Sequence, residues 1–286
     1  MHALLLDPFW SYGFMRTALV ALLGLALANG PVGVLLLARR MSLTADVLSH
    51  AVMPGAAIGF LVAGYSLIAL SLGGLTAGLL VGLLASFTIS LGRGRSEATL
   101  AVFYLLSLAG GVLLVSLRGS NLDLMHVLLG TILAVNMPAL VFIAFVASIT
   151  LLTLAAIWRP LAVESFDPLF LRSVGGGGPL FRNLFVALVV LCLVAGFQAF
   201  GTLFAVGPLL LPAVAARLWV ADLRAQVALA VLIGLASGII GLLLSYHLNL
   251  PSGPAIVLTA GTICAVSILA PRRRQPTASV IWQAAE

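Results

Sequence analysis

The chain has 286 residues, of which 62% are hydrophobic and only 8% are charged, and its mean hydropathy is +1.23. A soluble globular protein carries about 25% charged residues, so this composition excludes a single water-soluble domain. The net charge is +6, but the 14 basic residues, all arginine, stand singly or in short groups between apolar runs. A nucleic-acid groove needs them clustered, so we expect contact with membrane lipid and no nucleic-acid partner.

The composition also restricts the chemistry. A P-loop places a lysine on the β- and γ-phosphates of ATP, and this sequence contains no lysine. It contains no GxSxG or HExxH motif either. We therefore predict that the chain is not an enzyme and that any ATP it depends on is hydrolysed by another chain.

Apolar runs in the first half are continuous and long enough to cross about 30 Å of hydrocarbon, which indicates helices rather than a β-barrel. The expected spans cover residues 14–38, 42–64, 66–91, 97–117 and 138–157. Residues 123–135 are apolar but too short to cross, so they are expected to form an interfacial or re-entrant helix.

A polar segment at residues 158–182 divides the two halves. Val163, Phe166, Phe170 and Val174 within it fall near helical spacing, which predicts a short amphipathic helix. Further spans are expected at residues 183–200, 226–248 and 253–269, before a basic tail at 271–286.

Residues 201–218 form one more apolar run, but Gly207, Pro208 and Pro212 predict a kinked or broken helix there. The expected fold is therefore an all-α, polytopic membrane bundle of about eight or nine transmembrane helices, organised as one domain over residues 1–286. If all nine segments cross, every arginine except Arg16 and Arg118 falls on one side, which the positive-inside rule makes cytoplasmic.

Two ionisable residues lie inside an expected span. Asp46 and His50 are four residues apart and so share one helix face, which continues to Pro54 and Gly55, where a kink is expected. A carboxylate oxygen beside an imidazole nitrogen suits a borderline divalent cation such as Zn²⁺ or Mn²⁺. The alternative is a capping Asp followed by a His that bonds a backbone carbonyl.

A second pair, Asp123 and His126, lies in the short non-spanning segment. Its polar groups could simply be solvated at the membrane surface. The other possibility is an outer vestibule that attracts the metal or passes it on.

Five stretches together resemble the permeases of metal-type ABC importers, which transport zinc, manganese or iron. They are Met41 to Gly55 around Asp46 and His50, Asp123 to Gly130, Phe166-Asp167-Pro168, Gly201 to Arg217, and Leu250 to Pro254. The five occur in the family's order and are spread along most of the chain, from residue 41 to residue 254.

This resemblance implies a bacterial inner-membrane protein that works as a homodimer with a cytoplasmic ABC ATPase and an extracytoplasmic metal-binding protein. It implies that Asp46 and His50 form the translocation site. It also implies that the segment around Phe166, Asp167, Pro168 and Phe170 is a cytoplasmic coupling helix seated on the ATPase. No permanently bound cofactor is expected, since the metal is the cargo and ATP is bound by the partner.

Two rival functions stay open on the sequence. One is the permease of a B12, haem or siderophore importer, whose wide path has little need for metal-donor side chains. The other is a stand-alone secondary transporter that needs no ATPase. Among metals, zinc is the first expectation and manganese the second, with iron also possible.

Overall fold

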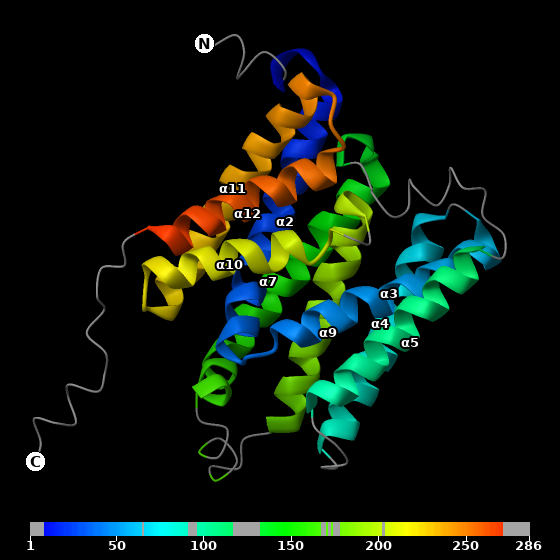
Figure 1. The fold of residues 1–286 in the computed structure, drawn as a ribbon, viewed down its shortest axis with the longest axis vertical. Helices are drawn as coiled ribbons and strands as arrows, with labels where there is room; N and C mark the ends of the chain where they lie inside the picture. Colours follow the sequence, from blue (N-terminus) through cyan, green and yellow to red (C-terminus); the bar gives the residue numbers. More distant parts are fainter. Residues whose placement is uncertain are drawn as a thin grey trace, which may run out of the picture.

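The computed structural model describes residues 9–64, 66–90, 96–116, 132–166, 170, 173, 178–201 and 204–270. Within this part of the chain the elements are all helical, as predicted (Figure 1). In chain order they are α2 (Gly13–Ala38), α3 (Ser42–Ala63), α4 (Leu67–Ser90), α5 (Ser96–Ser116), the 3₁₀ turn η1 (Ile132–Ala134), α7 (Met137–Phe166), α9 (Gly178–Phe200), α10 (Gly207–Trp219), α11 (Leu223–Leu248) and α12 (Ser252–Leu269).

Seven of these helices are long and apolar enough to cross a membrane: α2, α3, α4, α7, α9, α11 and α12. Two shorter apolar helices, in α5 and α10, complete the set of nine segments that the sequence predicted. The chain is a multi-pass membrane protein.

The helices alternate in direction between two ends of the bundle. At one end, Arg39 pairs with Glu164 and the Arg217 side chain donates a hydrogen bond to the Leu37 carbonyl. We call this the arginine end. At the other end the Ile132 amide donates to Ser252 Oγ at 3.1 Å.

The described arginines follow this alternation. Those at or near the arginine end are Arg39, Arg40, Arg159, Arg182, Arg217 and Arg224, whereas Arg16 lies in the first turn of α2 at the opposite end. This is the distribution on which the predicted orientation rests. That the arginine end faces the cytoplasm stays a prediction.

The bundle has two parts, as Figure 1 shows. Helices α2, α7, α9, α10, α11 and α12 pack together and form one part. Helix α3 contacts α2 only slightly and packs mainly on α4 and α5, with which it forms the other part. The parts meet where α4 crosses α9. There Gly74 and Gly78 of α4 allow close approach, because these residues without side chains face Val194 and Val190 of α9.

The predicted polar segment at 158–182 is shorter than expected. Helix α7 continues past residue 157 to Phe166 despite Pro160, and α9 begins at Gly178. The extension of α7 carries Glu164 and Ser165, which bind Arg39 from the end of α2. The sequence-based boundary was wrong because this stabilising contact joins residues far apart in the chain.

The predicted break in 201–218 is confirmed. Gly201 has a φ of +82° and α10 begins only at Gly207, with Pro208 in its first turn and Pro212 inside it. At about 1.5 Å per residue, the 13 residues of α10 cover about 20 Å, less than the hydrocarbon thickness. The break is covered by protein, since Ala205 is 3% exposed, as non-helical backbone at membrane depth requires.

Candidate functional site

Asp46 and His50 occupy successive turns near the start of α3, toward the arginine end. The Nε2 atom of His50 lies 4.0 Å from Oδ1 of Asp46. The Asp46 side chain is 51% exposed and the His50 side chain 16%. The structure therefore brings the two predicted donors together on one face of a membrane helix.

The distance between His50 Nε2 and Asp46 Oδ1 decides whether the two side chains bond each other or could bind a cation between them. It is longer than a hydrogen bond, so the carboxylate and the imidazole do not satisfy each other directly. Two donors on one tetrahedral ion, each about 2.1 Å from it, lie about 3.4 Å apart. A small side-chain rotation would therefore let both atoms bind one cation.

The structure adds Tyr104 of α5 to this site. Its ring contacts the His50 ring edge to face, with centroids 4.8 Å apart and planes at 83°. The contact limits the rotation of the imidazole. Sequence reasoning missed Tyr104 because a pairing between two helices leaves no spacing signal in the chain.

The pair alone does not complete a metal site. The described residues contain no group of three or more His, Cys, Asp or Glu side chains placed to hold a metal ion. A structural zinc site uses four donors, and manganese commonly takes six. Further donors would therefore come from water, from backbone oxygens, from residues outside the described part of the chain or from another chain.

The predicted kink at Pro54 and Gly55 lies inside α3, which stays helical through it. Gly55 packs directly on the backbone of Gly73 in α4, and Met53 packs on Gly111 of α5. Close packing therefore accounts for Gly55. A role of the proline in widening the metal path stays a prediction.

Several predicted residues are not placed. Asp123, His126, Asp167 and Pro168 lie outside the described residues. Phe166 ends α7, but its side chain also lies outside the description. Phe170 is described, and it is 56% exposed.

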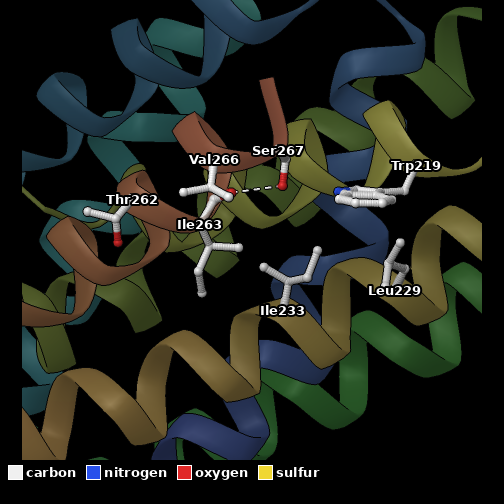
Figure 2. Close-up of a pocket in the computed structure, with 7 residues that line it drawn as sticks. All are labelled: Trp219, Leu229, Ile233, Thr262, Ile263, Val266 and Ser267. Carbon is white, nitrogen blue, oxygen red and sulfur yellow. Dashed lines mark hydrogen bonds between the residues drawn. The ribbon is translucent and has the colours of Figure 1, made fainter. Parts of the chain in front are cut away.

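A separate groove of about 510 Å³ lies between α10, α11 and α12 (Figure 2). It is lined by Trp219, Leu229, Ile233, Thr262, Ile263, Val266 and Ser267. The Ser267 hydroxyl donates to the Ile263 carbonyl at 2.7 Å. The lining offers no carboxylate, imidazole or thiol, so this groove is not a metal site.

The chain resembles known proteins over almost its whole length. It is 32% identical over 271 residues to the manganese import system permease protein ScaB of Streptococcus parasanguinis, covering 94% of this chain and 95% of the relative. It is 31% identical over 266 residues to the manganese transport system membrane protein MntC of Listeria innocua, covering 93% and 94%.

A solved structure agrees with these relatives. PsaBC from Streptococcus pneumoniae, determined in complex with a Fab, matches with a TM-score of 0.86 and 28% identity, over 98% of this chain and 99% of that one. The model of one family, the ABC 3 transport family, matches residues 11–270. Because that match covers most of the 286 residues, the chain belongs to the ABC 3 transport family.

Proposed function

We propose that this chain is the membrane permease of an ATP-driven importer of divalent transition-metal ions, and that the ion passes Asp46 and His50. The observation that carries the proposal is the 4.0 Å approach of a carboxylate oxygen and an imidazole nitrogen inside a span. Charged groups in a membrane are costly, so such a pair usually serves transport or binding.

Manganese is the first candidate for the ion. The relatives ScaB and MntC are named as proteins of manganese import or transport systems, and the Haemophilus influenzae relative, 27% identical, is called a probable iron transport system membrane protein. An oxygen and a nitrogen donor accept manganese, zinc and ferrous iron. The zinc preference expected from the sequence thus takes second place in the proposal.

The exposure of Asp46 supports a homodimer. Half of this carboxylate side chain is exposed on a membrane helix, where contact with lipid would be unfavourable. A second copy that faces α3 would cover it and supply a further Asp46 and His50. Four donors would then surround the ion.

Two further partners complete the proposed importer. A cytoplasmic ABC ATPase would supply the energy, because the chain lacks the P-loop lysine. An extracytoplasmic metal-binding protein would deliver the ion. No permanently bound cofactor is required, because the metal is the substrate.

The test is uptake of ⁵⁴Mn²⁺ by proteoliposomes that contain the chain together with a candidate ABC ATPase and a candidate metal-binding protein from the same organism. We expect uptake that needs ATP and is competed by free Mn²⁺. Uptake without the ATPase would instead support a secondary transporter. Competition by a siderophore, haem or B12, but not by free metal, would support the chelate-importer alternative.

A further inference from the structure

The side chain of Arg39 connects three helices at the arginine end. Its Nη2 atom lies 2.7 Å from Glu164 Oε2, and its Nε atom donates to Ser165 Oγ at 3.1 Å. Its guanidinium carbon lies 4.7 Å from the centre of the Phe185 ring. Arg39 ends α2, the two acceptors belong to the last turn of α7, and Phe185 lies in α9.

This contact is buried and rigid. The side chains of Arg39 and Glu164 are 6% and 12% exposed. The Leu161 carbonyl also accepts hydrogen bonds from Arg39 Nη2, at 3.4 Å, and from Ser165 Oγ, at 2.7 Å. A buried arginine with a carboxylate and two further acceptors is held in one orientation.

The backbone after Arg39 leads directly into α3, the helix that carries Asp46 and His50. Arg40 adopts a left-handed conformation with φ of +56°, and the Met41 amide donates to the Leu36 carbonyl at 2.9 Å. This closes α2 with a Schellman-type turn. Helix α3 begins at Ser42. Only this tightly bonded turn therefore separates Arg39 from the helix that carries Asp46.

The α7 side of the Arg39 contact borders the segment that is proposed to bind the ATPase, which was defined above by Phe166, Asp167, Pro168 and Phe170. We call it the ATPase-docking segment. Glu164 and Ser165 immediately precede Phe166-Asp167-Pro168 in sequence, and α9 begins after the same segment. Arg39 therefore binds the helix that enters this segment and packs on the helix that leaves it. A displacement of either helix end would pull on Arg39 and, through the turn, on the start of α3.

We propose that Arg39, with Glu164 and Ser165, is a mechanical latch that transmits movement of the ATPase-docking segment to the start of α3 and hence positions Asp46 and His50. Arg39 is a positioning residue and does not touch the metal. This inference rests on the proposed function.

The test follows the position of α3 itself and does not depend on metal. Leu43, in the first turn of α3, is 59% exposed. The native thiols Cys192 and Cys264 are 2% and 5% exposed and should label slowly. A Leu43→Cys chain, in complex with its ATPase, is reacted with a maleimide with and without vanadate-trapped nucleotide. With the latch intact we expect the labelling rate to change at least fivefold.

The latch is removed in two ways. Arg39→Met with Glu164→Leu replaces both charges by apolar groups and leaves neither partner unpaired, a change that buried ion pairs often tolerate. Glu164→Gln keeps the side-chain shape and removes one charge. This single variant replaces the double variant in the test if the double variant fails to assemble. Arg159→Met is the matched control, because Arg159 is an exposed arginine on the same helix.

We expect the nucleotide-dependent change to fall below twofold in the latch variants, with the ATPase still bound, and to persist in the control. A full change in the latch variants, or an equal loss in Arg159→Met, would overturn the latch alone. A wild-type chain that binds no ATPase would overturn the proposed function and the latch with it. A latch that behaves as expected in a complex that moves no metal would contradict only the choice of cargo.

Discussion

The phenol ring of Tyr104 contacts the imidazole of His50 edge to face, with ring centroids 4.8 Å apart. The two residues come from α5 and α3, so the orientation of the proposed metal ligand depends on how these helices pack. Aromatic pairs in this geometry contribute about 0.5–1.5 kcal/mol beyond their burial. The contact therefore restricts the imidazole without fixing it completely.

Removing this ring should weaken metal capture. We expect Tyr104→Ala to raise the KM for Mn²⁺ uptake about two- to tenfold, because the imidazole loses the contact that orients it. Maximal uptake should change little, since neither ligand is removed. Tyr104→Phe keeps the ring and should behave like the wild type. An equal loss in both variants would mean that the hydroxyl, and not the ring, is what matters.

The packing of α3 on α4 predicts a sensitive glycine. A methyl group at Gly55 would overlap the backbone of Gly73, so both helices would have to separate. Overpacking of this kind costs about 1–3 kcal/mol. Gly55→Ala should therefore lower the Tm of the detergent-purified protein by several degrees. Gly110→Ala is the control, because nothing lies within 4 Å of the added methyl group, and its Tm should not fall.

The arginine distribution predicts a cytoplasmic C-terminus. A reporter that is active only in the cytoplasm, fused after Arg274, should be active. The same reporter fused at Gly64, at the end of α3, should be silent. The reverse pattern would show that the arginine end faces outward.

The exposed side chain of Phe170 leads us to expect that the ATPase binds at this residue. It is 56% exposed in the segment between α7 and α9, and an exposed aromatic side chain there fits an apolar groove on a partner. Phe170→Asp introduces a charge into that contact and should remove the ATPase from the purified complex. Phe170→Leu stays apolar and should retain it. Wild-type co-purification of the Phe170→Asp chain would contradict the docking assignment.

The helices could be predicted from the sequence because apolar runs of sufficient length need no knowledge of tertiary contacts. Helix α3, expected at residues 42–64, is observed at Ser42–Ala63. The pair Asp46 and His50 was also accessible, since i and i+4 share a face on any helix. The break before α10 followed from Gly207 and Pro208, whose backbone chemistry is local.

What could not be predicted depends on contacts between distant residues. The end of α7 at Phe166 is stabilised by Arg39 across 125 positions of sequence separation from Glu164. Tyr104 reaches His50 only because α3 turns away from α2 to pack on α5. Hydrophobic periodicity does not encode either relationship.

The most direct test of the central claim is metal uptake by variants of the two proposed ligands. Asp46→Asn keeps the side-chain size and removes the charge, while His50→Ala removes the nitrogen donor. The Asp46 side chain is 51% exposed and the His50 side chain is 16% exposed, and neither belongs to the buried hydrophobic core, so both proteins should reach wild-type levels in the membrane. Asp222→Asn is the matched control, because Asp222 caps α11 at the surface through a bond to the Ala225 amide that asparagine can also accept.

In a strain that lacks other manganese importers, we expect Asp46→Asn and His50→Ala each to reduce ⁵⁴Mn²⁺ uptake at least tenfold at wild-type protein levels. Asp222→Asn should take up the ion normally. Wild-type uptake by well-expressed Asp46→Asn and His50→Ala proteins would contradict the assignment of this pair as the metal site.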